Sequence, residues 1–144
     1  FQLVINDGSP TLSYFPFADT FGVPDLLGGW NPYYDLTGFA STPGQEGNGT
    51  SRHITAKDGA AFSIANFFGT GVQLFGNISE AGTYDLQVDG QTNRSISVFS
   101  PSDPTLLASY TSLPAANHTL SLVFHNPSGN TDTLISIERA VILV

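Results

Sequence analysis

The stretch "FFGTGVQLFG", residues 67–76, places three glycines and a threonine among apolar residues. A phosphate-binding loop of this kind would continue with Gly-Lys-Ser/Thr and then a helix. Here no Lys follows, and residues 72–75 begin another apolar run instead. Because glycine fits where bulkier residues would clash, Gly69 and Gly71 predict a sharp hairpin or bulge between two buried strands. The stretch therefore favours β-structure over a nucleotide-binding loop.

The composition is that of a folded domain with an apolar core. The chain has 144 residues, of which 40% are hydrophobic and 11% are charged. We expect residues 1–144 to form one domain. The chain has no Cys, which excludes disulfides, thiolate zinc sites and Cys nucleophiles. No apolar run approaches the length of a membrane span.

The charge argues against polyanionic partners. The net charge is −8, and the four basic residues are scattered along the chain. Phosphate backbones are bound by clustered Lys and Arg, so we expect no nucleic acid partner.

Short apolar runs recur about every ten residues between turn-forming residues, which is typical of an all-β domain. In "TYDLQVDG" Tyr84, Leu86 and Val88 share one face, and this alternation indicates a half-buried strand. One short helical turn is expected around Val23–Leu27. The expected strands are residues 1–5, 11–15, 51–56, 60–68, 71–76, 82–89, 94–99, 105–111, 118–125 and 133–143.

Two antiparallel sheets packed face to face would bury these apolar faces, so we predict a two-sheet β-sandwich of the jelly-roll kind. Asp89-Gly90 predicts a hairpin turn. Residues 16–50 differ, because they are rich in aromatics, Gly and Pro and have weak periodicity. A long irregular segment in a compact domain is usually functional or covers the edge of the core.

Four N-x-[ST] sequons lie next to predicted turns, where a glycan can extend into water. We therefore expect an N-glycosylated, secreted or extracellular protein of the cell surface or wall. The glycosylation candidates are Asn48, Asn77, Asn93 and Asn117.

Longer motifs resemble a family of secreted or membrane-anchored ectodomains of mushroom-type (basidiomycete) fungi. "AAFSIANFFGTGVQLFG" resembles the family pattern Phe-x-Phe-x-Phe-x-Gly-Thr-x-Val-x-Leu-x-Gly. Four further segments resemble motifs of the same family in the same order: "INDGSPTLSYFP", Trp30 with Asn31, "GTYDLQVDGQ" and "SLPAANHTLSLVFHN". The final segment, "ISIERAVILV", takes the place of the family's closing strand. The chain departs from the pattern at Ala115-Ala116, which replaces a Gly, and at Arg139, which replaces an aromatic.

The resemblance implies a β-sandwich similar to galactose-binding-like carbohydrate-binding modules. Sugars stack on aromatic rings that have polar groups beside them, and "GGWNPYYDLTGF", residues 28–39, supplies both. The alternative is that Trp30 plugs the end of the sandwich. The candidate carbohydrate-binding residues are Trp30, Asn31, Tyr33, Tyr34 and Asp35.

Catalysis has no clear signature in the sequence. There is no Gly-x-Ser-x-Gly elbow and no His-Glu-x-x-His motif, and His118 and His125 are predicted on opposite strand faces. We expect a non-catalytic protein without a cofactor, with a hydrolase built from distant residues as a remaining alternative. A structural Ca²⁺ near Asp7 and Glu138 is a further alternative.

The two termini offer a rival function. "FQLVI" and "AVILV" are apolar and β-rich, and free edges of this kind can pair with another chain. We expect both to lie within the sandwich. The alternative is a structural protein whose copies assemble through strand edges.

Overall fold

The computed structural model describes residues 1–18, 24–39, 50–92 and 105–144. The described part contains no helix long and apolar enough to cross a bilayer, and its regular elements are strands. The strands are β1 (Gln2–Asn6), β2 (Leu12–Phe15), β3 (Asn31–Tyr34), β4 (Gly38–Phe39), β5 (Ser51–Thr55), β6 (Ala61–Gly69), β7 (Gly71–Ile78), β8 (Thr83–Val88), β9 (Gln91–Thr92), β10 (Leu106–Tyr110), β11 (Ala116–His125) and β12 (Ile135–Leu143).

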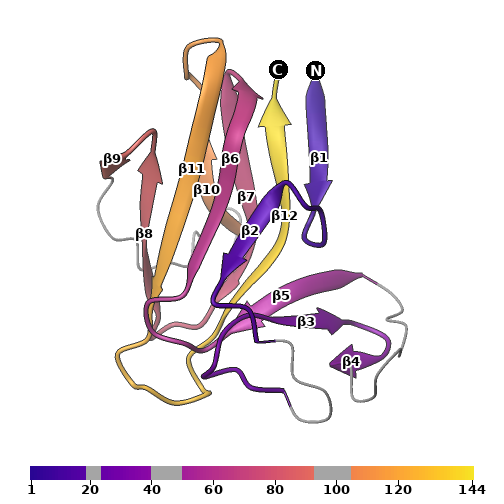
Figure 1. Cartoon of the computed structure of the whole chain (residues 1–144), viewed down its shortest axis with the longest axis vertical. Coiled ribbons are helices and arrows are strands. Elements are labelled where there is room, and N and C mark those ends of the chain that lie inside the picture. The colour runs from indigo at the N-terminus through magenta and orange to yellow at the C-terminus, as the bar shows by residue number, and fades with distance from the viewer. Residues whose placement is uncertain (19–23, 40–49, 93–104) are drawn as a thin grey trace.

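The strands form two antiparallel sheets, which confirms the predicted all-β sandwich. One sheet has five strands in the order β2-β6-β11-β8-β9. The other has seven strands in the order β10-β7-β12-β5-β3-β4, with β1 paired to β12. Figure 1 shows β6 and β11 in front of β10 and β7, with β8 to their left, while β5, β3 and β4 run crosswise below them. We call β3, β4 and β5 the wing.

Alternating side chains of the two sheets build the core, as predicted. Tyr84 and Leu86 of β8 and Leu120, Leu122 and Phe124 of β11 are almost wholly buried. They pack with residues of β7 and β12 in one hydrophobic cluster. Burying each large apolar side chain contributes about 1.5–3 kcal/mol, so these faces carry much of the stability.

The Gly-Thr-Gly stretch is a corner between the two sheets. Strand β6 ends at Gly69 in one sheet, and β7 begins at Gly71 in the other. A Cβ atom on Gly69 would lie 2.4 Å from the Leu143 carbonyl oxygen, and one on Gly71 would lie 2.4 Å from that of Tyr110. The prediction of a close backbone approach is confirmed. The prediction of a hairpin or bulge is wrong, because the chain crosses to the opposite layer.

The turn at Asp89-Gly90 is the predicted hairpin, and it joins β8 to β9. Asp89 and Gly90 have φ of 54° and 79°, the left-handed values that a two-residue hairpin turn needs.

The two apolar terminal strands have different environments. Strand β12 lies inside its sheet, with β7 on one side and β5 and β1 on the other. Strand β1 pairs only with β12, and its Leu3 and Val4 are 48% and 55% exposed. Both terminal strands therefore lie within the sandwich, as expected, but β1 is an edge strand, because no described strand covers its second edge.

The described parts of residues 16–50, which are 16–18, 24–39 and 50, contain more strand and less helix than expected. Strands β3 and β4 lie here, and the expected helical turn is a hydrogen-bonded turn over 26–28. Gly28 N donates to both the backbone oxygen (3.1 Å) and the Oδ1 (2.9 Å) of Asp25, which closes the turn. Val23 and the expected strand 94–99 lie outside the described residues.

Candidate functional site

Trp30 is a core residue. Its side chain is fully buried, its ring lies edge-on to Tyr14 at 5.3 Å, and its Nε1 donates a 2.9 Å hydrogen bond to the Ala61 carbonyl oxygen. A ring without exposed surface cannot stack on a sugar. The prediction of Trp30 as a binding residue is therefore wrong. Its full burial agrees with the alternative that Trp30 plugs the sandwich.

Asn31 is also buried, with 3% of its surface exposed. Its amide nitrogen donates to the carbonyl oxygens of Asp25 (2.9 Å) and Gly29 (3.0 Å), and its Oδ1 accepts from Asp25 N at 3.2 Å. The side chain holds the preceding turn in place. Its predicted role in carbohydrate binding is wrong for the same reason as that of Trp30.

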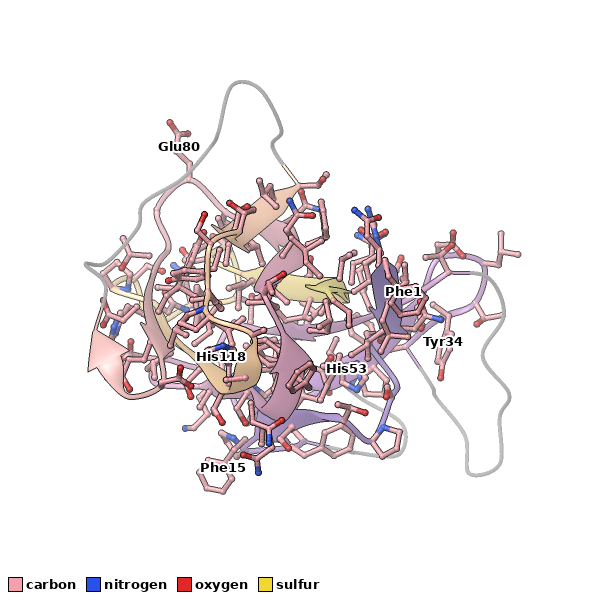
Figure 2. All side chains as sticks on the ribbon, turned by 90° about the horizontal axis from the view of Figure 1, so that it is seen from above. Phe1, Phe15, Tyr34, His53, Glu80 and His118 are labelled. Carbon is pink, nitrogen blue, oxygen red and sulfur yellow. The ribbon has the colours of Figure 1, made fainter. Side chains whose placement is uncertain are left out.

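The remaining candidates lie in β3 of the wing or directly after it, and they have accessible surface. Tyr33 is half-buried and sits opposite Arg52 of β5 and Phe39 of β4 in the strand register. Its ring is edge-on to Phe39 at 5.0 Å, and the Arg52 guanidinium carbon lies 5.9 Å from its centroid. We call Tyr33, Phe39 and Arg52 the aromatic corner. Tyr34 is half-buried at the rim in Figure 2, and Asp35 is exposed.

Arg52 has one unusual atom. Its Nε is buried and has no hydrogen-bond partner within the described ranges. The guanidinium is the cation of the aromatic corner, and it has hydrogen-bonding capacity that the surrounding strands do not use.

A second polar cluster surrounds Asp7, directly after β1. The carboxylate is 1% exposed and accepts hydrogen bonds from the Ser51 hydroxyl and, at 2.7 Å, from Nδ1 of His53. His53 stacks on Tyr14 with centroids 4.0 Å apart, and the Tyr14 hydroxyl donates to the Asp7 carbonyl oxygen at 2.8 Å. Burial and the nearby Asp7 carboxylate raise the pKa of Tyr14. The cluster ties the end of β1 to β2 and β5.

The predicted approach of Asp7 to Glu138 is confirmed. Asp7 N donates to the Glu138 carbonyl oxygen at 3.2 Å, next to a cavity of about 320 Å³. The cavity is lined by Asn6, Asp7, Thr50, Ser51, Glu138 and Arg139. No group of three or more His, Cys, Asp or Glu side chains is placed to hold a metal in the described part of the chain. The calcium site stays a prediction.

The other two histidines also pair with aspartates. His125 Nε2 lies 2.5 Å from Asp85 Oδ2 and is half-buried, whereas His118 is buried, so their predicted placement on opposite faces is confirmed. His118 contacts acceptors with both ring nitrogens, Asp89 Oδ2 at 2.6 Å and the Pro114 carbonyl oxygen at 2.6 Å. These two hydrogen bonds raise the pKa of His118, and the bond from His118 lowers the pKa of Asp89.

These pairs do not form a hydrolytic triad. A nucleophilic hydroxyl needs a base within hydrogen-bond reach. Ser51 is close to such a group, but it bonds to the Asp7 carboxylate and not to His53. The aspartate therefore orients both side chains, and the described contacts do not connect the serine to the imidazole of His53.

An apolar groove runs beside β1. It has a volume of about 580 Å³ and lies between β1 and the end of β6 that β2 does not cover. The exposed ring of Phe68 stands at its side. Its apolar lining comes from Leu3, Val4, Ile5, Phe67, Phe68 and Ile142.

The sequons are only partly described. Asn77 of β7 and Asn117 of β11 are exposed, as a glycan acceptor must be. Asn48 and Asn93 lie outside the described residues. Glycosylation at all four stays a prediction.

Comparisons with known proteins show the fold. No protein-family model and no curated protein matches the chain. Among solved structures, a family two carbohydrate esterase from Cellvibrio japonicus is similar at a TM-score of 0.63 and 11% identity, over 99% of this chain and 33% of that chain. A two-domain esterase active on acetylated mannans, crystallised with mannopentaose, is similar at 0.59 and 11%, over 97% and 35%.

The catalytic domain of Agl-KA is similar at a TM-score of 0.54 and 10% identity, over 99% of this chain and 27% of that chain. The chain thus spans about a third of the length of the two esterases, at 33% and 35%. At these identities the likeness shows that the chain shares a β-sandwich with parts of carbohydrate-active enzymes. The resemblance to the fungal family stays a prediction.

Proposed function

We propose that the chain is an extracellular, N-glycosylated and non-catalytic module that binds carbohydrate of a cell surface or wall. The observation that carries this proposal is the aromatic corner. Its Tyr33 ring is partly open to solvent and is held by Phe39 on one strand and by Arg52 on another. A fixed ring next to a hydrogen-bond donor is the arrangement that sugar recognition requires.

The chemistry of the corner suits a sugar. The apolar C–H face of a pyranose packs on the tyrosine ring, while the Arg52 guanidinium donates to ring or hydroxyl oxygens. Asp35, exposed just after β3, accepts from sugar hydroxyls. With one main ring, we expect weak binding to a single sugar and stronger binding to a polysaccharide that offers many copies.

One observation supports a non-catalytic role. Ser51, the hydroxyl of the Asp7 cluster, bonds to the Asp7 carboxylate and not to the imidazole of His53, so it lacks the histidine contact that activates a serine nucleophile.

Titration calorimetry with soluble neutral polysaccharides tests the proposal, with mannan included because one similar protein acts on acetylated mannans. We expect binding by the wild type and about tenfold weaker binding by Tyr33→Ala, since the variant loses the stacking ring. Phe68→Ala, an exposed ring in the β1 groove, is the matched control and should bind like the wild type. Equal affinity of Tyr33→Ala and the wild type would overturn the assignment of the corner.

A second candidate function is assembly with further copies of the chain. The observation that favours it is the free edge of β1, whose exposed side chains line the 580 Å³ groove. Residues 1–5 carry no charged side chain, and neither does the groove lining, so β1 of a second copy can pair there without contacts between like charges. An antiparallel β1–β1 pair is self-complementary and gives a symmetric dimer.

Sedimentation velocity over a range of protein concentrations tests this second candidate. Val4→Lys should remove any dimer, because edge lysines block strand pairing. Leu36→Lys, at an apolar and more exposed site in the turn between β3 and β4, should leave the dimer intact. A wild type that stays monomeric at all concentrations contradicts assembly and leaves carbohydrate binding untouched.

A further inference from the structure

The outer face of the five-stranded sheet carries an ordered row of polar side chains. Ser13 of β2 pairs with Ser63 of β6, Ser63 with Ser121 of β11, and Ser121 with Gln87 of β8. These four residues are therefore neighbours across four strands, on the face opposite the core. We call them the serine row.

A second row runs directly beside the first. Phe15 pairs with Ala61, Ala61 with Val123, and Val123 with Asp85. The Phe15 ring is 74% exposed, and Figure 2 shows it projecting away from the body of the protein. At the opposite end, His125 hydrogen-bonds Asp85.

The sizes of these side chains shape the face. The two central strands, β6 and β11, present Ala61, Ser63 and Ser121, which are small, and Val123, which is of intermediate size. The larger Phe15 and Gln87 stand on the outer strands, β2 and β8. Side-chain size therefore falls from the outer strands toward the two central ones, and we call this part of the face, from Phe15 on β2 to Gln87 on β8, the trough. Three strand spacings make it about 14 Å long, enough for a short oligosaccharide.

We propose that this trough binds an extended, neutral polysaccharide chain. The Phe15 ring stacks on one sugar, and the serine row exchanges hydrogen bonds with the hydroxyls of the following sugars. This inference rests on the proposed carbohydrate-binding function and adds a second surface, remote from the aromatic corner in the strand order.

The charges of the face select a neutral ligand. None of the strands β2, β6, β8, β9 and β11 contains Lys or Arg, and Asp85 stands at the margin of the trough. With a net charge of −8 on the chain, a polyanion such as nucleic acid or a polyuronate is repelled.

The chemistry of the face also disfavours a protein partner. The cores of protein interfaces are apolar and rich in large anchoring residues. Here the centre is made of serines, an alanine and Val123, and Phe15 is the one large exposed apolar side chain of the two rows. Each serine hydroxyl both donates and accepts, as the hydroxyls of a sugar do, so the two surfaces are complementary.

Titration calorimetry with neutral polysaccharides of different backbones, mannan, xylan and β-glucan, tests the trough. We expect Phe15→Ala and Gln87→Ala, at its two ends, each to bind about tenfold more weakly than the wild type. Ser121→Glu, in the centre, should abolish binding at this face, because it places a bulky charge across the trough. Phe68→Ala, another exposed ring, is the control for a general loss of apolar surface.

The outcomes separate this inference from the proposed function. If the wild type binds none of the polysaccharides, the proposed function fails and the trough fails with it. If the wild type binds and Tyr33→Ala weakens binding while Phe15→Ala, Gln87→Ala and Ser121→Glu do not, the trough alone is overturned. Circular dichroism confirms that each variant is folded, and Ser121→Glu and Gln87→Ala decide the matter even if Phe15→Ala changes the local backbone.

Discussion

Trp30 and Phe15 are two aromatic residues on opposite sides of the same position in β6. The Trp30 Nε1 donates to the Ala61 carbonyl oxygen from inside the sandwich, where the ring is fully buried. Phe15 is the register partner of Ala61, and its ring is 74% exposed on the outer face. Sequence composition alone favours the tryptophan as the binding residue, whereas the fold makes it part of the core and leaves the phenylalanine free to meet a ligand.

The difference shows what decides the role of an aromatic residue. In β2 the side chains alternate, so Leu12 and Tyr14 face inward while Ser13 and Phe15 face outward. Trp30 precedes β3 and is fixed by backbone hydrogen bonds, from its nitrogen to Pro16 and from Ala18 to its oxygen. Strand register, not residue type, sorts the rings into core and surface.

The largest expected effect is on stability at Trp30. Trp30→Ala removes a fully buried ring and leaves the Ala61 carbonyl without its side-chain donor, so it should lower the free energy of unfolding by about 3–5 kcal/mol. Urea denaturation measures this. Phe15→Ala is the control and should change stability by less than about 0.5 kcal/mol, because its ring is exposed. Similar losses for both variants would contradict the division into core and surface.

The next effect concerns the cluster at Asp7. Asp7→Ala leaves His53 and the Ser51 hydroxyl without their buried acceptor, which should cost about 3 kcal/mol in the same assay. Asp35→Ala removes an exposed carboxylate and should stay within about 0.5 kcal/mol of the wild type. A stable Asp7→Ala protein would mean that the cluster does not hold β1 to the sandwich.

The smallest effect is a pH dependence from His118. Hydrogen bonds to Asp89 and to Pro114 raise the pKa of His118 in the folded protein. This shift adds stability that is complete below about pH 6.5, the ordinary pKa of histidine, and that is lost as the pH rises through the raised pKa of His118. Hydrogen bonds from His118 and, to a smaller extent, from the backbone nitrogen of Thr119 lower the pKa of Asp89. This shift adds stability that is complete above about pH 4 and that is lost as the pH falls through the lowered pKa of Asp89.

Denaturation curves collected from about pH 5 to pH 9 test this point. The free energy of unfolding of the wild type should decline more steeply above about pH 6.5 than that of His118→Asn. Parallel profiles for the two proteins would show that His118 does not carry this charge in the folded state.

The fold could be predicted from the sequence because its signals are local. The alternation of Leu120, Leu122 and Phe124 places them in the core, and Asp89-Gly90 marks a hairpin without any tertiary information. The exposed edge of β1 has no such signal, because "FQLVI" reads the same in a central strand and at an edge.

The site could be predicted only in part because its contacts are long-range. Tyr33 owes its setting to Arg52 and Phe39 on neighbouring strands. His53 meets Asp7 across 46 residues, and His118 meets Asp89 across 29, so neither pair has a spacing that a sequence motif records. The serine row is likewise visible only once the register of four strands is known.

The central claim is that surface rings, and not the buried tryptophan, meet a neutral carbohydrate. An NMR titration of the ¹⁵N-labelled protein with a neutral oligosaccharide tests it most directly. The account predicts saturable shifts of amide signals around Tyr33, Phe39 and Arg52, while the amides of Asp7 and Glu138 stay unchanged. Unchanged spectra up to millimolar sugar, or shifts confined to the Asp7 cavity, would contradict it.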